Sequence, residues 1–142
     1  MRILVVGTGG VGSAFARIAT RRGFFESCAL ADYDPARAHD VAASLDDGRF
    51  SAHAVDASSA ESVAGLIRET RADAVLNSVD PLFNVPVFDA CFEAGVTYLD
   101  MYRQIAFSET ASKRFSGASF CSRWMIPVSV AMRKRCFGER FA

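Results

Sequence analysis

The sequence predicts an α/β fold: a doubly wound parallel sheet, with helices on both faces, in a single domain. Two observations carry this prediction. Short apolar segments rich in β-branched residues alternate with longer segments of helical spacing from Arg2 to Met101. Four of the ten glycines also fall within six positions, directly after the first apolar segment. Alternation of this kind predicts parallel strands joined by right-handed helical crossovers.

The expected elements follow in the order β-α-β-α-β-α-β-α-β. Strands are predicted over residues 2–6, 28–32, 50–56, 73–79 and 96–101. Helices are predicted over residues 11–22, 36–45, 60–69 and 84–94.

Residues at the expected helix ends support these boundaries. Gly23 and Gly95 stand where a glycine commonly closes a helix. Asp34 is followed by proline, a pattern typical of an N-cap and the first helical position. Either Ser58 or Ser59 is suited to cap the third helix.

Composition narrows the class of protein. The 142 residues are 51% hydrophobic and 23% charged, as expected of a globular chain with a buried core. We find no apolar run near the roughly 20 residues that span a bilayer and no leader-like segment, so a cytoplasmic location is expected.

The four cysteines form no C-x-x-C pair and only two histidines are present, so no metal site is expected. Cys28 and Cys91, in apolar segments, are expected to be free, buried thiols.

The glycine cluster reads G-T-G-G-V-G, from Gly7 to Gly12, between a predicted strand and a predicted helix. In that context the pattern predicts a Rossmann-like dinucleotide site. Gly7 permits the tight turn, Gly9 permits close approach of a pyrophosphate, and Gly12 permits close packing of helix on strand. The helix N-terminus then faces the phosphates. The G-K-S/T pattern of nucleoside triphosphate sites is absent.

An acidic residue at the end of the second strand supports the same interpretation. Asp32 follows Gly7 by 25 positions and is suited to bind the adenosine ribose hydroxyls. Asp34 is a rival for that role, although its N-cap position explains it more simply. Arg37 either approaches the 2′-phosphate of NADP or faces solvent. The carboxylate of Asp32 would repel that 2′-phosphate. We therefore expect NAD, with NADP the less favoured cofactor.

Residues 72–101 carry a more distinctive pattern than the glycine motif. The stretch ADAVLNSVDPLFNVPVFDACFEAGVTYLDM, residues 72–101, resembles the N-terminal NAD(P)-binding domain of the saccharopine dehydrogenase-like family. So do MRILVVGTGGVGSAFARIATRRG and LADYDPARAHDVAASL. The resemblance covers residues 1–101, and the block around Asn77, Pro81, Asn84 and Pro86 is more specific than the glycines alone.

The resemblance implies an NAD(P)-dependent dehydrogenase that acts on CH–NH bonds of amino-acid-derived amines. It also implies where the cofactor lies. Gly7, Thr8, Gly9, Gly10, Val11 and Gly12 would line the pyrophosphate, Asp32 and Tyr33 the adenosine ribose, Asp56 and Ala57 the adenine, and Ser78 and Val79 the nicotinamide ribose. NADP-binding relatives carry a small polar residue and an arginine at the positions of Asp32 and Tyr33, so this departure also favours NAD.

Catalytic residues are not identified. Asn77 is expected to cap a strand end, Asp80 to turn the chain with Pro81, and Asp100 to be a solvated acid at a strand end. In such enzymes the protein orients a cofactor that carries the hydride.

A second segment, residues 102–142, differs from the first 101. Residues 1–101 hold 8 basic and 14 acidic side chains, whereas residues 102–142 hold 8 basic and 2 acidic ones. Three interpretations are open: a basic interaction arm, a shortened native ending, or the product of a shifted or truncated reading frame, which we favour. The longest basic run is Arg133-Lys134-Arg135, so neither nucleic acid nor membrane is expected as a partner. Exposed apolar groups there would favour a homodimer.

Two functions follow from these observations. The first is the cofactor-binding domain of a saccharopine dehydrogenase-like oxidoreductase, inactive alone because no segment is recognisable as a substrate domain. Its partners would be the dinucleotide and, in a full-length parent, a small amine or amino-acid substrate. The alternative is a stand-alone NAD-binding regulatory module, like those of potassium-uptake systems.

Overall fold

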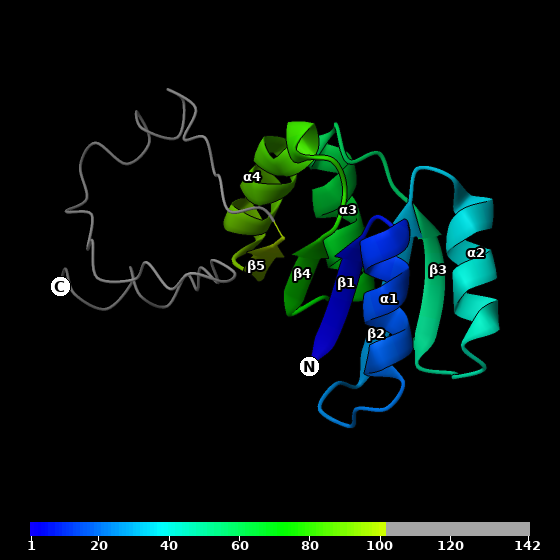
Figure 1. Cartoon of the computed structure of the whole chain (residues 1–142). Helices are drawn as coiled ribbons and strands as arrows, with labels where there is room; N and C mark the ends of the chain where they lie inside the picture. Colours follow the sequence, from blue (N-terminus) through cyan, green and yellow to red (C-terminus); the bar gives the residue numbers. More distant parts are fainter. Residues whose placement is uncertain (102–142) are drawn as a thin grey trace, which may run out of the picture.

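The computed structural model describes residues 1–101, and the interpretations given above for residues 102–142 fall outside the described residues. The order of elements agrees with the prediction (Figure 1). The strands are β1 (Arg2–Val6), β2 (Ser27–Asp32), β3 (Phe50–Ala54), β4 (Ala74–Asn77) and β5 (Thr97–Asp100). The helices are α1 (Gly10–Ala19), α2 (Pro35–Ser44), α3 (Ala60–Thr70) and α4 (Asn84–Ala94), with a 3₁₀ turn, η1 (Pro81–Phe83), before α4.

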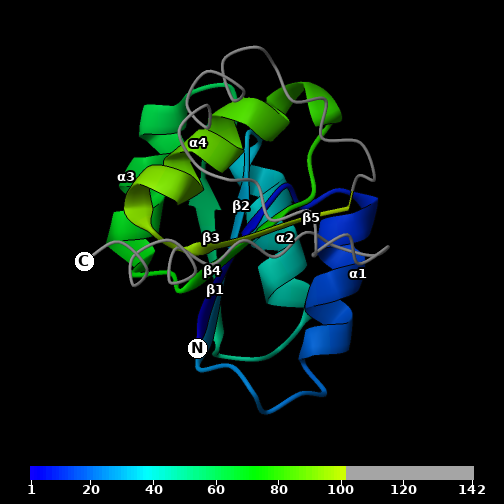
Figure 2. The same cartoon turned by 90° about the vertical axis from the view of Figure 1, so that its left-hand side faces the viewer.

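The five strands form one parallel sheet in the order β3-β2-β1-β4-β5. The chain runs outward from β1 to β3, then crosses back to β4 beside β1. This is the doubly wound arrangement, and its crossover point lies between β1 and β4. Figure 2 shows α1 and α2 on one side of the sheet and α3 and α4 on the other.

The alternating side chains of the strands build two cores. On the α1 and α2 face, Ile3 and Val5 pack with Leu30 and Phe25. On the α3 and α4 face, the core holds Leu4, Val6, Val63, Ile67, Val75, Val87 and Tyr98. β1 lies between two paired strands and under both helix layers, which is why its apolar run is continuous rather than alternating.

Three strands and one helix are shorter than predicted, and β5 loses one residue at each end. β3 ends at Ala54 and β4 at Asn77, because the residues that follow leave the sheet to form loops. Helix α1 ends at Ala19, whereas the sequence predicted continuation to residue 22 with closure by Gly23. That closure is wrong: the glycines with positive φ in residues 1–101 are Gly7 and Gly95.

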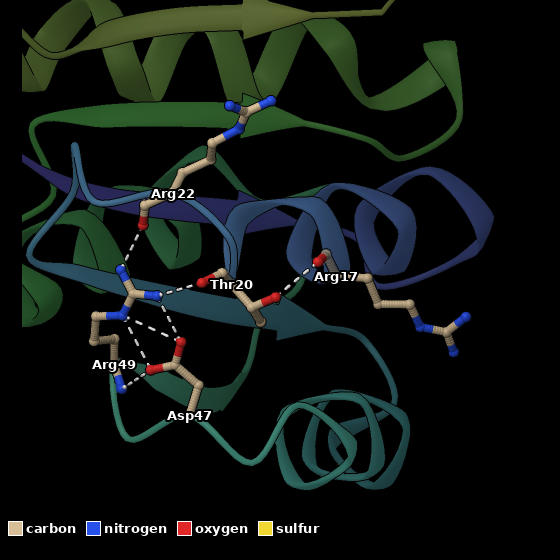
Figure 3. Close-up of polar contacts among 5 residues, drawn as sticks. All are labelled: Arg17, Thr20, Arg22, Asp47 and Arg49. Atoms are coloured by element: carbon tan, nitrogen blue, oxygen red, sulfur yellow. Dashed lines mark hydrogen bonds and ion pairs between the residues drawn. The ribbon is translucent and has the colours of Figure 1, made fainter.

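Arg49 is bonded to the chain that follows α1 (Figure 3). Its guanidinium donates to the carbonyl oxygens of Thr20, at 3.0 Å, and Arg22, at 2.7 Å. It also pairs with Asp47 at 2.6 Å and lies 4.3 Å from the centre of the Phe25 ring. The chain therefore ends α1 without a glycine cap: the carbonyls of Ile18 and Ala19 accept the N–H groups of Arg21 and Arg22, at 3.2 and 2.8 Å, and that of Thr20 accepts from Arg49.

The remaining helix ends are closed by specific residues. Gly95, at φ 69°, closes α4 as predicted, whereas α3 is closed by Arg71 at φ 52°. The side chain of Asp34 caps α2, as predicted. Of the two serines proposed for α3, Ser59 is the cap, because its Oγ accepts the N–H of Ser62 at 3.2 Å.

Cys28 and Cys91 are free and buried, as predicted, and burial raises the pKa of each thiol to about 12. Within residues 1–101, no helix combines the length and apolar character needed to cross a membrane.

Candidate functional site

The carboxyl ends of β1, β2 and β4, with the loop after β3, surround a cleft of about 290 Å³. Ligands bind at this edge in open α/β sheets, where the loops leaving the strands diverge. The lining consists of Val6, Gly7, Gly9, Asp32, Tyr33, Arg37, Val55, Asp56, Ala57, Ser58, Ser78, Val79, Asp80 and Phe83.

Gly7 makes the turn that leads from β1 into this cleft. Its φ is +96°, a conformation that residues with a side chain rarely adopt, and its N–H donates to the Ala31 carbonyl at 2.7 Å. A Cβ placed on Gly7 would lie 2.7 Å from Val79 Cγ1 and 2.9 Å from the Ser78 carbonyl oxygen. The tight turn predicted for Gly7 is therefore present, and the loop after β4 closes over it.

Gly12 lets α1 lie directly against this turn. A Cβ on Gly12 would stand 1.9 Å from the Gly7 carbonyl oxygen, so no larger residue fits. Gly9 differs, because a Cβ there would meet no protein atom within 4 Å while the residue lines the cleft. Gly9 is thus a place where the protein leaves room for backbone contact with a ligand.

Asp32 ends β2 and turns back toward the glycine turn. It is 7% exposed, and its Oδ2 accepts hydrogen bonds from the Thr8 N–H at 2.7 Å and the Thr8 Oγ1 at 2.8 Å. Its other oxygen, Oδ1, accepts the Asp34 N–H at 3.1 Å and lies 3.6 Å from Arg37 Nη1. Burial alone would raise the pKa of Asp32, but these donors outweigh it and lower the pKa overall. The carboxylate therefore stays charged at neutral pH.

Asp56 and Ser58 form the side of the cleft that follows β3. Asp56 Oδ1 accepts the Ser58 N–H at 2.9 Å and the Ser58 Oγ at 2.6 Å. The Ser58 side-chain and backbone hydrogen bonds lower the pKa of Asp56. Ala57, between them, also lines the cleft. The loop is thereby held in one turn with an apolar methyl group flanked by polar atoms.

Ser78 joins the loop after β4 to the glycine turn. Its one hydroxyl proton is shared between the carbonyl oxygens of Gly7, 2.6 Å from Oγ, and Val6, 3.0 Å away, and its N–H donates to the Val6 carbonyl at 2.8 Å. Its hydroxyl is therefore occupied within the protein, and its backbone and Val79 form the cleft wall.

Eight residues of the predicted site line the cleft together: Gly7, Gly9, Asp32, Tyr33, Asp56, Ala57, Ser78 and Val79. Four do not. Thr8 and Gly12 are buried beneath the cleft, while Gly10 and Val11 are exposed beside it. Sequence reasoning did not place Val6, Val55, Ser58, Asp80 and Phe83 in the lining. Val6, the last residue of β1, and Val55, the residue after β3, were detectable as the last apolar residues of two predicted strands, whereas Phe83 depends on the 3₁₀ turn.

Two polar residues near this edge behave differently from the prediction. Asp100 is not a solvated acid: it is 8% exposed, and its Oδ2 accepts the Tyr98 hydroxyl at 3.1 Å. Asn77 does more than end its strand, because it bonds to Asn84 and Tyr98. Asp80 does turn the chain, since its Oδ1 accepts the Leu82 N–H at 3.0 Å. In residues 1–101 no group of three or more potential metal ligands comes together.

The chain is similar to a known protein family and to several known enzymes. The family model described as "Saccharopine dehydrogenase NADP binding domain" matches residues 3–121, so the likeness continues beyond Met101, where the motifs quoted above end. The carboxyaminopropylagmatine dehydrogenase of Synechocystis sp. is 32% identical over 99 residues, covering 70% of this chain and 25% of the relative. The carboxynorspermidine synthase of Vibrio cholerae is 31% identical over 109 residues, covering 70% and 26%. The chain thus spans about a quarter of the length of these relatives.

Solved structures show the same fold. The saccharopine dehydrogenase (L-Glu forming) of Saccharomyces cerevisiae matches with a TM-score of 0.63 at 12% identity, over 79% of this chain and 23% of that one. The quinate dehydrogenase of Corynebacterium glutamicum, in complex with NAD, matches with a TM-score of 0.55 at 23% identity, over 81% and 41%. Together with the family match, this arrangement of strands and glycines shows a dinucleotide-binding domain, and the chain belongs to the saccharopine dehydrogenase NADP binding domain family.

Proposed function

We propose that the cleft binds NAD, with the pyrophosphate over the glycine turn and the adenosine ribose at Asp32. The observation that carries this proposal is the contrast between the glycines: Gly7 and Gly12 are enclosed by protein, whereas Gly9 faces the cleft with no protein atom near. Helix α1 begins there without a side-chain cap, so its first N–H groups are available to phosphate oxygens.

The choice of NAD over NADP rests on Asp32. A buried carboxylate with a lowered pKa accepts hydrogen bonds from ribose hydroxyls and repels a 2′-phosphate. Arg37, also in the cleft lining, is the competing feature, because an arginine at this place suits a 2′-phosphate. The family description names NADP. We propose that Arg37 is committed to Asp32, 3.6 Å away, and that the net preference is for NAD.

Calorimetric titration of the purified chain with NADH and NADPH tests both parts. Gly9→Ala should abolish binding without loss of stability, since its Cβ meets ligand rather than protein. Gly23→Ala is the matched control, because it also adds a methyl to open space but lies away from the cleft lining. Asp32→Ser with Tyr33→Arg should move the preference toward NADPH. A folded wild-type chain that binds neither dinucleotide would refute the proposal.

For the whole protein we propose an oxidoreductase acting on an amino-acid-derived amine. Support comes from the relatives, whose names refer to carboxyaminopropylagmatine and carboxynorspermidine, both carboxylated amine compounds. When bound, the nicotinamide supplies hydride transfer, and the residues of this chain bind and orient it. Because the cleft-lining residues fit the cofactor, we propose that other parts of such an enzyme hold the amine and that this chain alone has no turnover.

The second candidate is a stand-alone NAD-binding regulatory module. In its favour, the residues that line the cleft include those proposed to contact the cofactor, and none of them is assigned to a substrate. Absorbance of NADH in the presence of saccharopine, lysine and polyamine substrates tests what the two candidates share, because both expect no turnover by this chain alone. Turnover by this chain would contradict both its proposed inactivity and the regulatory role.

A cytoplasmic location is proposed on the free, buried thiols of Cys28 and Cys91, which suit a reducing compartment. The expected homodimer depends on residues 102–142 and stays a prediction.

A further inference from the structure

Four polar side chains form a continuous hydrogen-bonded chain under the start of α4. Asn77 Nδ2 donates to Asn84 Oδ1 at 2.8 Å and to the Tyr98 hydroxyl at 3.0 Å. The Tyr98 hydroxyl donates in turn to Asp100 Oδ2 at 3.1 Å. Asn77 and Asp100 are direct partners across β4 and β5, so the side chains share one face of the sheet.

This network is buried, and the donor and the acceptor of each hydrogen bond in it are fixed. Asn77, Tyr98 and Asp100 are 2%, 3% and 8% exposed. Asn77 uses its amide nitrogen toward both neighbours and its Oδ1 toward the Val79 N–H, at 3.4 Å. Tyr98 accepts from Asn77 and donates to Asp100, and burial foremost raises the pKa of its hydroxyl. The phenol therefore keeps its proton across the ordinary pH range.

Packing alone does not require these polar groups. The Tyr98 ring meets Phe88 edge to face, with ring centres 5.5 Å apart, and phenylalanine would make the same contact. Burying polar atoms is unfavourable unless every partner is present, so such a network is expected where it fixes a particular arrangement.

The segment that the network fixes is the wall of the cleft. Asn77 stands immediately before residues 78–83 and Asn84 immediately after them, and the bond between their side chains closes this segment into a loop. Ser78, Val79, Asp80 and Phe83 within it line the cleft. On its far side the same segment is bonded to the glycine turn through Ser78. The wall is thus held from both sides.

We propose that Asn77, Asn84, Tyr98 and Asp100 are positioning residues, which hold residues 78–83 in place as the surface against which the nicotinamide half of the bound dinucleotide rests. The inference rests on the proposed cofactor function. It assigns the network no contact with the cofactor. Its effect should therefore be confined to the nicotinamide end, because the adenosine end is formed by Asp32, Tyr33 and the loop after β3.

Two ligands that share the adenosine half separate this role from a general structural one. Tyr98→Phe and Asn84→Ala should weaken NADH binding by about tenfold, the effect of disturbing one well-formed hydrogen bond, and leave ADP, which lacks both the nicotinamide and its ribose, nearly unchanged. Thr70→Val is the control, because it removes a half-buried hydroxyl, bonded to the Leu66 carbonyl at 2.7 Å, outside the cleft lining. Equal weakening of both ligands, or no weakening of NADH, would overturn the proposal.

Hydrogen exchange tests the wall without any ligand. The N–H groups of Leu82 and Phe83 are bonded to Asp80, each at 3.0 Å, and should exchange about fivefold faster in Tyr98→Phe and Asn84→Ala. Amides of β1 report global opening, and the acceleration at Leu82 and Phe83 should exceed any change there. Unchanged exchange at Leu82 and Phe83 would refute the positioning role. Wild-type protein that binds neither ligand would instead refute the cofactor function.

Discussion

The carboxylate of Asp32 and the backbone and hydroxyl of Thr8 meet at 2.7 and 2.8 Å, although the two residues are 24 positions apart. Thr8 is 2% exposed, so this contact lies beneath the cleft. It ties the end of β2 to the glycine turn and orients the acid proposed to receive the ribose. The second residue of the glycine motif is thus bonded to the acid, while its contact with the pyrophosphate stays a prediction.

Removal of the Thr8 hydroxyl should weaken this link. Thr8→Val keeps the shape of the side chain but leaves one bond to a buried carboxylate unmade, a loss of about 1–3 kcal/mol in the free energy of unfolding. NADH binding should weaken as well, because Asp32 gains freedom. Chemical denaturation and titration measure the two effects. Thr8→Ser keeps the hydroxyl and should lie near wild type; an equal loss in both variants would contradict this explanation.

A methyl group at Gly12 should be far more harmful than one at Gly10. Gly12→Ala places Cβ 1.9 Å from the Gly7 carbonyl oxygen, so the helix or the turn must move, at a cost of about 3 kcal/mol. Gly10→Ala meets no atom within 4 Å and should change stability by less than about 0.5 kcal/mol. Denaturant midpoints compare them directly. Similar stability of the two variants would show that α1 does not pack as described.

Loss of the Arg49 side chain should loosen the loops at the amino ends of the strands. Arg49→Met leaves the carbonyls of Thr20 and Arg22 and the carboxylate of Asp47 without this partner, and the midpoint of thermal unfolding should fall by several degrees. Arg17→Met is the matched control, since that side chain points away from the cluster (Figure 3). A fall of equal size in the control would indicate a general charge effect.

The pair of Arg2 and Asp73 should contribute stability that depends on acid pH. Hydrogen bonds from the Arg2 side chain, foremost, and from its backbone lower the pKa of Asp73 to about 2. A carboxyl whose pKa is lower in the folded state stabilises that state above its unfolded pKa, near 4, and loses the effect as pH falls toward 2. Asp73→Asn should therefore be less stable than wild type at pH 6, with the difference narrowing between about pH 4 and 2. A difference independent of pH would contradict this assignment.

Local signals were enough to predict most of the fold. Strand, glycine turn and helix follow one another within twenty residues, and Asp34 and Gly95 mark helix ends by chemistry that acts over two or three positions. Gly23 misled for the same reason: it has the local signature of a helix end, but the Thr20 carbonyl that it would have served accepts from Arg49, in a distant loop. A contact between residues so far apart in the sequence cannot be recognised from a local sequence pattern.

The residues of the candidate site also divide into those with a local signal in the sequence and those without one. Gly7, Gly9 and Asp32 were predictable because the motif has a fixed spacing in the chain. The bond of Asp32 to Thr8 and the chain from Asn77 to Asp100 were not, because they depend on the register between neighbouring strands. Asp100 accepts from Tyr98, two positions earlier in β5, but the bond that joins this pair to Asn77 forms only because β5 lies beside β4.

The enclosure of Gly7 and Gly12 changes how tolerance to substitution should be interpreted in this domain. In a library of all single variants selected only for a soluble, folded chain, both positions would already be depleted of every other residue. Scarcity of variants there would then report on the backbone and not on chemistry. Gly9 would remain variable in that library and become invariant only when survival requires the cofactor. The difference between the two selections, position by position, would outline the ligand's footprint without any ligand being observed.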